Sequence, residues 1–493
     1  MHIKITVLVW ATIIASSSLN THLLHSKSTP DLIQSLFNTG KQLFDQKKYT
    51  EALAAFSQLL SKDPNHAPTH YTLALLFDRT GNKIKAVEHA QEALNSATDL
   101  TTLNRCSCIL TQEDQLEKAL VGYLELCKQQ PDNHFWNYNA GSLLSILNNH
   151  EQALTFYKKA IALNPSHEEA RLGFSKALLA CGYFDLGWKE FEYRMDYSQE
   201  FQRYFKYPDL DLKSLKGKRI LLLAEWGLGD TLHFVRYAKK LKELGATVYL
   251  QTFDPLVKLL SACPYLDKVI RQGDSLPKAD TRIPLLSLPL VFKTTLDTIP
   301  TDIPYLSAQN KLVQEWQKKI SADKNFKIGL CWHAKPIYLE DHVYTRRSVP
   351  LEKFLPLTTI PGISLYSLQK NFGTNELNEK MRRIQTFGSE LDEAHGPFMD
   401  TAALIKNLDL IISADTSIVH LAGGLGTPTW VLLPYSAEWR WLHDRTDSPW
   451  YPNVMRLFRQ QKPGDWDTVV YTIATALETL LKEKKSNKKE RTS

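Results

Sequence analysis

Polar residues follow an apolar run in the segment 409–434, DLIISADTSIVHLAGGLGTPTWVLLP, where they could bind an anion. The run 408–412 predicts a buried strand, and the polar turn 413–417 follows it. Residues 418–425 then predict a short helix, and 429–433 a second buried strand. Amides and hydroxyls at such a helix start suit a phosphate. An ordinary helix cap is an equally weighted alternative, because Asp, Ser and Thr are common capping residues.

A second polar turn, Gly227-Leu228-Gly229-Asp230, follows the apolar run 220–224. A helix is predicted over 231–244, because its apolar residues recur on one stripe. The turn is not a dinucleotide fingerprint, since it lacks the third glycine. Asp230 is therefore either a helix cap or, as a functional residue, a carboxylate base.

These two turns belong to a region of alternating strands and helices. The alternation predicts an N-terminal lobe at 217–310 and a C-terminal lobe at 326–482, each with a parallel sheet between helices. Ligands in such folds bind at the carboxyl ends of strands. We therefore expect 227–230 and 413–420 to face one another across a cleft. A linker without a long periodic run, 200–216, precedes the lobes.

The region 31–199 repeats itself about every 34 residues, in about five units. Small residues mark each unit at Ala52, Ala86, Ala119, Ala153 and Gly187. Four residues beyond these stand Phe56, Ala90, Tyr123, Tyr157 and Phe191. Gly40 and Gly141 each precede an alanine by twelve residues. The small residues should let two helices cross closely while an aromatic ring fills the space between them.

This spacing resembles the tetratricopeptide repeat, an all-α helical hairpin of 34 residues. The resemblance implies a continuous core and a concave groove. Two roles remain open for the array: binding a protein or peptide partner, or acting as a spacer that supports the next domain.

Length and composition place the chain among ordinary multidomain globular proteins. It has 493 residues, 43% hydrophobic and 23% charged, enough for roughly three domains. Of the net charge of +6, the last twelve residues carry +4, so the body is nearly neutral and no nucleic-acid partner is expected. The tail 483–493 is expected to be a frayed, solvated end. The six cysteines form no CxxC pair, so neither a disulfide scaffold nor a metal site is expected.

The N-terminal segment 1–22 contains an apolar run, 5–15, behind Lys4. This run resembles a secretory signal peptide. It is too short to span a bilayer, which needs about 20 residues. An uncleaved anchor and an apolar extension packed on the first repeat are the alternatives.

Taken together, GLGDTLHFVRYAKKLKELGA and ADTSIVHLAGGLGTPTWVLLP resemble glycosyltransferase family 9, the heptosyltransferase-like group with the GT-B architecture. The match covers about residues 217–480. The resemblance implies two Rossmann-like lobes and inversion at the anomeric carbon. It also implies a nucleotide-sugar donor as substrate, without a cofactor or a required metal.

Site residues follow from the resemblance position by position. Asp230 holds the place of the catalytic base, and Asp415 the place of the aspartate that binds donor-sugar hydroxyls. The residues after Asp415 would bind the diphosphate. The complete donor-binding set implied by the two motifs is Gly229, Asp415, Thr416, Ser417 and His420.

Cations are needed to stabilise a departing diphosphate, and the best candidates are Arg346 and Arg347, followed by Lys335. A solvated charged loop is the alternative. The stretch CWHAKPIYLEDHVYTRRSVP departs from the family pattern, since Ala334 replaces Gly and Lys335 replaces Asn. Alanine does not readily adopt positive φ. A reshaped loop is therefore predicted, with either a changed substrate or lost activity.

Three functions are consistent with these observations. The first is an inverting glycosyltransferase whose repeats recruit the acceptor or a protein partner. The second is a non-catalytic scaffold with a degenerate glycosyltransferase-like domain. The third, based on architecture alone, is a protein O-glycosyltransferase. Nucleotide sugars are cytosolic, so the first favours a cytoplasmic catalytic region, with membrane association and a secretory signal left open.

Overall fold

The computed structural model describes residues 29–195, 210–335 and 346–490. The N-terminal segment 1–22, most of the expected linker 200–216 and the end of the tail lie outside the described residues. Contacts divide the chain into two compact units, Met1–Trp136 and Asn137–Ser493. Among the helices of the described ranges, none has both the length and the apolar character needed to cross a bilayer.

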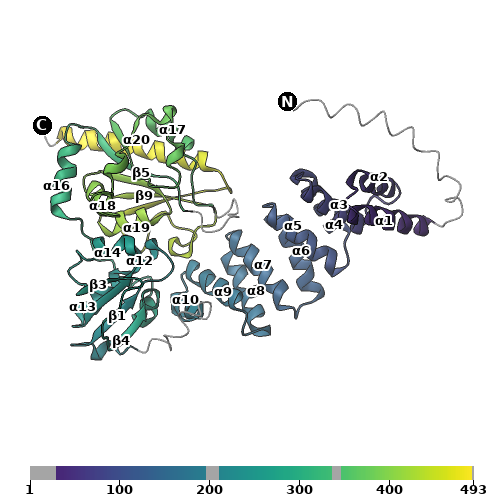
Figure 1. Ribbon diagram of the computed structural model, residues 1–493, viewed down its shortest axis with the longest axis horizontal. Helices are drawn as coiled ribbons and strands as arrows, with labels where there is room; N and C mark the ends of the chain where they lie inside the picture. Colours follow the sequence, from purple (N-terminus) through teal and green to yellow (C-terminus); the bar gives the residue numbers. More distant parts are fainter. Residues whose placement is uncertain (1–28, 196–209, 336–345, 491–493) are drawn as a thin grey trace. The chain divides into compact units, whose positions relative to one another are not determined.

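Ten α-helices of the described residues form the N-terminal helical region (Figure 1). They are α1 (Thr29–Asp45), α2 (Tyr49–Leu60), α3 (Ala67–Arg79), α4 (Lys83–Ser96), α5 (Leu100–Gln112), α6 (Leu116–Gln129), α7 (His134–Ile146), α8 (His150–Leu163), α9 (Glu168–Ala180) and α10 (Phe184–Phe191). Within the first unit, α1 packs on α2, α3 on α4, and α5 on α6. Within the second unit, α9 packs on both α8 and α10. The region is all-α, as its period predicts.

Close packing at the small repeat positions explains the helical pairs. The four phased alanines are completely buried. A Cβ added at Gly40 would lie only 2.4 Å from Phe56 Cε1, and one added at Gly141 would lie 3.1 Å from Tyr157 Cδ1. Each aromatic ring therefore occupies the space that a glycine leaves. This arrangement confirms the predicted pairing of small and aromatic residues.

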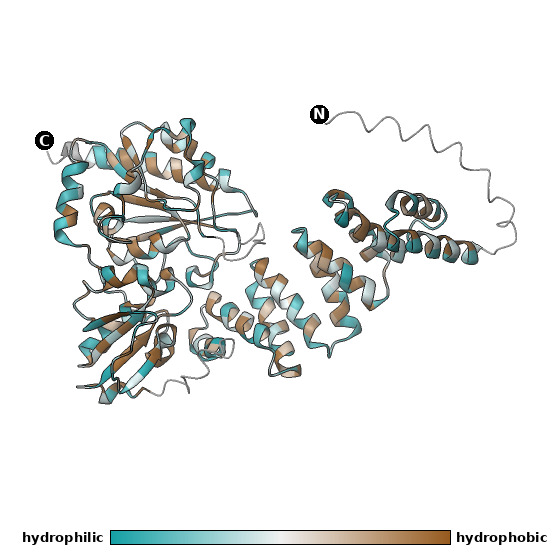
Figure 2. Ribbon diagram, in the orientation of Figure 1, coloured by the Kyte–Doolittle hydropathy of each residue, from teal (hydrophilic) through white to brown (hydrophobic). Residues whose placement is uncertain are grey.

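The first lobe contains a four-stranded sheet in the order β3-β2-β1-β4, with every pair parallel. Its strands are β1 (Arg219–Leu223), β2 (Thr247–Thr252), β3 (Lys268–Arg271) and β4 (Thr281–Pro284). Its α-helices are α12 (Leu228–Phe234), α13 (Arg236–Glu243), α14 (Asp254–Leu260) and α15 (Leu288–Val291). Register places Ile220 between Val248 and Thr281. The central strand β1 is hydrophobic and buried along most of its length, as expected for a parallel sheet covered by helices, and Figure 2 shows brown residues in the middle of this sheet.

The second lobe contains a six-stranded parallel sheet in the order β10-β9-β8-β5-β6-β7. Its strands are β5 (Phe326–Cys331), β6 (Ile363–Ser367), β7 (Ile384–Gln385), β8 (Leu410–Ala414), β9 (Thr429–Leu433) and β10 (Met455–Arg459). The α-helices from residue 310 onward are α16 (Asn310–Lys319), α17 (Leu355–Thr358), α18 (Met399–Ile405), α19 (Ser417–Gly424) and α20 (Trp466–Glu490). The C-terminal region is therefore α/β with two parallel sheets.

Several element boundaries differ from those the sequence predicts. Helix α12 begins at Leu228 instead of residue 231, and it gives way to α13 at Val235. Gly227 adopts an extended conformation and serves as the N-cap, so the first turn starts directly behind it. Asp230 consequently lies inside the first helical turn and does not cap the helix. Strand β8 continues through Ala414, so Ser413 and Ala414 belong to the strand and not to a turn.

The tail also differs from expectation. Helix α20 continues to Glu490, whereas the sequence predicts that it ends at Lys482 and that the tail 483–493 is frayed. Lysine and glutamate are strong helix formers, which accounts for the continuation.

One hydrophobic core within the second unit extends from the last repeat into both lobes. It includes Trp188 and Phe191 of the repeat, Phe234 of the first lobe, and Leu421 and Trp450 of the second. The indole nitrogen of Trp188 also donates a 2.9 Å hydrogen bond to the carbonyl of Thr294. The last repeat therefore shares its core with the α/β region.

Candidate functional site

The starts of helices α12 and α19 pack against each other, one from each lobe. The contact depends on Gly229, because a Cβ added there would lie 3.6 Å from Ser417 Cα and 3.2 Å from His420 Cδ2. Two polar turns that lie far apart in the sequence are thereby brought together. The two turns thus meet as predicted, but by direct contact of the helix starts and not across the expected cleft.

The carboxylate of Asp230 pairs with Arg440. Arg440 Nη2 donates to Asp230 Oδ1 at 2.6 Å, while no described residue forms a hydrogen bond with Oδ2. Burial raises the pKa of Asp230 above its usual value, and the charge of Arg440 opposes that effect. Arg440 thus orients the carboxylate through Oδ1, and Oδ2 is available to accept a hydrogen bond.

Asp415 lies close by, at the carboxyl end of β8. Its Oδ2 accepts a 3.0 Å hydrogen bond from the indole nitrogen of Trp441. Trp441 directly follows Arg440 in the short 3₁₀ segment Trp439–Trp441. Burial lowers the pKa of Arg440, but the charges of Asp230, Glu438 and Asp415 outweigh that effect and raise it. One three-residue segment therefore holds carboxylates from both lobes.

Helix α19 begins with the pattern expected of a capped N-terminus. Thr416 is the N-cap, and its hydroxyl accepts a 3.2 Å hydrogen bond from the amide of Ile418. Ser417 is the first helical residue and is partly exposed. Partial positive charge at the start of a helix favours an anion there. Thr416 thus has the capping role that the sequence left open, and the helix start keeps its electrostatic preference for an anion.

His420 is buried between two aromatic rings. Its ring stacks on His233, at 4.9 Å between centroids, and on Trp441, at 5.6 Å. Burial first, and then the charges of Arg440, Arg236 and Arg347, lower its pKa well below the usual value. The imidazole is therefore neutral at physiological pH.

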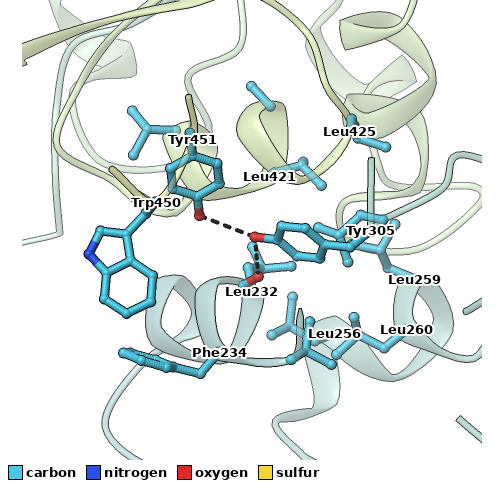
Figure 3. Close-up of a cluster of buried hydrophobic side chains, with 14 of the residues drawn as sticks. Leu232, Phe234, Leu256, Leu259, Leu260, Tyr305, Leu421, Leu425, Trp450 and Tyr451 are labelled. Carbon is cyan, nitrogen blue, oxygen red and sulfur yellow. Dashed lines mark hydrogen bonds between the residues drawn. The ribbon is translucent and has the colours of Figure 1, made fainter. Parts of the chain in front are cut away.

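A chain of hydrogen bonds indicates which ring nitrogen of His420 carries the proton. The hydroxyl of Tyr305 donates to the carbonyl of Leu232 at 2.9 Å, and it lies 3.1 Å from the hydroxyl of Tyr451 (Figure 3). Tyr451 must then donate to Tyr305, and so it accepts from His420 Nδ1 at 2.9 Å. Nε2 of His420 consequently carries a lone pair. A hydrogen-bond acceptor there suits a hydroxyl group better than a phosphate oxygen.

Arg236 fastens the two lobes just behind the site. Its guanidinium is almost fully buried and donates to the carbonyls of Pro300, at 3.1 Å, and Trp450, at 2.6 Å. It also donates to the hydroxyl of Tyr305 at 3.0 Å. In Figure 3 the side chains of Trp450 and Tyr451 meet Tyr305, Leu232 and Phe234 at this joint. The joint fixes the relative position of the two helix starts.

The predicted cations differ in their placement. Arg347 reaches the start of α19, where its Nη1 lies 3.5 Å from the carbonyl oxygen of Asp415. Arg346 and Lys335 are exposed. The loop between them, which includes His342, lies outside the described residues. Of the three predicted cations, Arg347 is therefore the one that we assign to the site.

Sequence reasoning missed Arg440, Trp441 and Tyr451. The run Trp-Arg-Trp at 439–441 was a visible signal, because it places a cation between two aromatic side chains. Its partners could not be identified, since they lie in distant parts of the chain. Within the described ranges, no group of three or more His, Cys, Asp or Glu side chains is arranged to hold a metal ion.

A separate hollow of about 560 Å³ lies at the last repeats of the second unit. Its lining is mostly apolar and includes Leu154, Phe174, Leu178, Phe184, Leu186 and Thr295. Leu186 and Tyr183 are about half exposed at its edge. Exposed apolar side chains around a hollow are typical of a surface that binds a partner.

Comparison with known proteins adds evidence for the helical region. Models of the tetratricopeptide repeat match residues 43–101 and 137–167. The protein FlbA of Caulobacter vibrioides is 23% identical over 479 residues, covering 89% of this chain and 77% of that protein. So large a share includes the α/β region as well as the repeats.

Two solved structures are similar to part of this chain. The crystal structure of MamA is 18% identical, with a TM-score of 0.28, and the match covers 34% of this chain and 97% of that one. The structure of pilF from Pseudomonas aeruginosa is 20% identical, with a TM-score of 0.25, and the match covers 34% of this chain and 78% of that one. The repeat models and the period of 34 residues agree, so the N-terminal region is an array of tetratricopeptide repeats.

Proposed function

We propose that this chain is an inverting glycosyltransferase that uses a nucleotide-sugar donor, with repeats that bind a protein partner. The observation that carries the proposal is the meeting of Asp230 and Asp415 at adjacent residues, Arg440 and Trp441. The two carboxylates come from different lobes, as a donor and an acceptor bound between lobes would require.

Asp230 is the proposed general base. Arg440 holds Oδ1, so Oδ2 can accept the proton of an acceptor hydroxyl as its oxygen attacks the anomeric carbon. The bond from that carbon to the diphosphate breaks on the opposite face, and the nucleoside diphosphate leaves with the electron pair. Configuration at the anomeric carbon is inverted.

The second lobe is the proposed donor side. Negative charge grows on the leaving diphosphate, and the start of α19 with Ser417 and the guanidinium of Arg347 would stabilise it. Asp415 and the acceptor nitrogen of His420 are suited to sugar hydroxyls. Gly229 permits the close approach of the first lobe to this region.

The repeats give the chain a second, non-catalytic role that stands apart from the chemistry. Tetratricopeptide arrays bind peptides and proteins, and the apolar hollow near Leu186 offers a surface for such a partner. A scaffold without catalysis is therefore the second candidate function. A protein acceptor held by the repeats would make the enzyme a protein O-glycosyltransferase.

A screen of nucleotides tests the leading proposal. Calorimetry with UDP, GDP, ADP and CMP should give binding to one of them, and the matching nucleotide sugar should be hydrolysed or transferred. Arg347→Gln should weaken that binding about tenfold or more, because a charged hydrogen bond contributes about 1.5–3 kcal/mol. Arg382→Gln is the control, since Arg382 pairs with Glu379 on the surface of the same lobe.

The scaffold makes the opposite prediction. Binding of none of the four nucleotides, together with tight binding of a protein partner to the repeats, would favour the scaffold and contradict the transferase. Equal loss of nucleotide binding in Arg347→Gln and Arg382→Gln would remove the assigned role of Arg347.

A further inference from the structure

A buried ion cluster links the end of the last repeat to the first lobe. Arg194 lies in the 3₁₀ turn Glu192–Met195 that follows α10, and its side chain is 1% exposed. Its guanidinium donates to both carboxylate oxygens of Glu225, at 2.7 and 3.1 Å, and to Glu192 Oε1 at 2.6 Å. It also donates to the hydroxyl of Ser287 at 2.9 Å, and that hydroxyl donates to Glu192 Oε2. One cation thus joins two carboxylates from different domains.

Glu225 stands at the entrance to the turn that carries Asp230. It follows β1 closely and precedes Trp226, whose φ of 64° is a left-handed conformation that a tryptophan rarely adopts. The carbonyl of Glu225 accepts a 2.9 Å hydrogen bond from the amide of Gly227, the N-cap of α12. Such a conformation persists only where its surroundings hold it. The side chain of Glu225 is therefore an attachment point for a strained turn.

A second contact from the same repeat reaches the next residue. The ring of Phe191 packs edge-on against Trp226, with 5.3 Å between centroids. Lys176 of α9 places its Nζ 5.7 Å from the centre of the Trp226 ring. The last repeat thus holds two consecutive residues of the turn, one through charge and one through packing.

We propose that Arg194 is a positioning residue: through Glu225, the last repeat fixes the turn 225–227 and thereby sets the location of Asp230. The proposal rests on the proposed function in that it takes Asp230 as the base. It makes the last repeat a structural part of the catalytic unit, in addition to any role of the array in recruiting a partner.

Arg194→Lys keeps the charge but has one nitrogen to replace three that bond five oxygen atoms, the carbonyl oxygen of Phe191 among them. The turn should loosen, and kcat should fall about tenfold to a hundredfold, since small displacements of a catalytic group have effects of that size. The KM for the donor should change less than about twofold, because the donor contacts lie in the other lobe. The matched control is Arg171→Lys, because Arg171 pairs with Glu190 at 3.3 Å within the same repeat.

Glu225→Gln separates positioning from general destabilisation. The charges that face Asp230 are those of Arg440, Glu438, Glu225 and Asp415, and the charge of Glu225 raises the pKa of Asp230. Removing it should shift the acid limb of the pH–rate profile to lower pH. Arg194→Lys, which keeps every charge, should leave that limb unshifted while kcat falls. A purely structural cluster would lower the amount of folded protein in Arg194→Lys without lowering kcat per folded molecule.

Hydrogen exchange gives a readout that does not need activity. In the folded full chain, amides of 224–232 should exchange faster in Arg194→Lys than in wild type or in Arg171→Lys. Wild-type kcat together with wild-type exchange in Arg194→Lys would overturn the positioning role. If wild type bound no nucleotide and transferred no sugar, the proposed function would fail. Faster exchange at 224–232 in Arg194→Lys would even then support the attachment of the turn to the last repeat. Unchanged exchange would overturn that attachment.

Discussion

Arg440 donates a 2.6 Å hydrogen bond to Asp230, from which 210 residues separate it in the chain. The next residue, Trp441, donates to Asp415. A segment of the second lobe therefore sets the geometry of a carboxylate in the first. The two candidate functional groups are coupled through one short 3₁₀ turn.

Asp230→Asn tests the base directly. The amide keeps an oxygen for Arg440 but cannot take a proton, so transfer should fall by about a hundredfold to ten-thousandfold. Nucleotide binding and melting temperature should stay close to wild type. Asp254→Asn is the matched control, because Asp254 lies in the first turn of another helix of the same lobe, and it should leave turnover unchanged. Full activity in Asp230→Asn would remove Asp230 as base.

Arg440→Met should change the pH dependence of turnover. Arg440 lowers the pKa of Asp230, so its removal raises that pKa further. A base acts only when deprotonated, and the acid limb of kcat/KM should therefore move to higher pH. Trp441→Phe serves as the control, since it removes a neutral donor to Asp415 and should leave the limb in place. An unshifted limb in Arg440→Met would contradict the pairing in solution.

Buried histidines should make stability depend on pH. Burial lowers the pKa of His233 and His420 well below the usual value of 6.5, so the unfolded chain takes up their protons first as the pH falls. Their contribution is intact above pH 6.5, and the free energy of unfolding should decrease below it by about 1.4 kcal/mol per pH unit for each histidine. Denaturant titrations at pH 7.5 and 5.5 measure the slope.

The variant His233→Phe should take up one proton fewer on unfolding, so the slope should fall by about 1.4 kcal/mol per pH unit. Neither ring nitrogen of His233 has a hydrogen-bond partner among the described residues. Phenylalanine should therefore preserve stability near neutral pH, because it packs a ring in the same place without burying polar atoms. An unchanged slope would show that His233 is not the buried neutral group assigned to it.

The repeat core offers a graded test of packing. Gly40→Ala would place a methyl group 2.4 Å from the ring of Phe56, and the strain should cost about 1–3 kcal/mol. Gly141→Ala meets Tyr157 at 3.1 Å, and the gain in helix propensity of about 1 kcal/mol should nearly offset the crowding. Thermal unfolding should thus rank Gly40→Ala as clearly the more harmful. Equal losses would contradict the geometry.

Local patterns predicted much of the fold. The period of 34 residues yielded the helical pairs, and an apolar run located strand β9, Thr429–Leu433, at its predicted bounds, whereas β8 lies two residues beyond its predicted run. Boundaries at polar turns were less accurate. Leu228 and Gly229 join helix α12 because Gly227 caps it, and no side-chain pattern signals that. The continuation of α20 to Glu490 likewise follows from propensity rather than from an apolar stripe.

Residues of the same motif were predictable as neighbours, and the meeting of the two motifs was predicted from the strand ends that they follow. Asp415, Thr416 and Ser417 follow one strand, so their proximity follows from the chain itself. Arg440 and Arg194 depend on tertiary contacts that bring remote segments together, and sequence spacing does not encode these. The roles of Asp230 and the donor-site residues in chemistry stay predictions.

Arg236 has a consequence for how ligands reach the site. Its charge is buried, and its donors are taken by groups on both sides of the joint, including the carbonyls of Pro300 and Trp450. Moving the lobes apart would remove the hydrogen-bond partners of this cation before water could replace them. Leaving a buried charge unpaired is costly. Ligands are therefore expected to enter and leave at the rim of the site, by rearrangement of side chains and loops, while the joint around Arg236 stays closed.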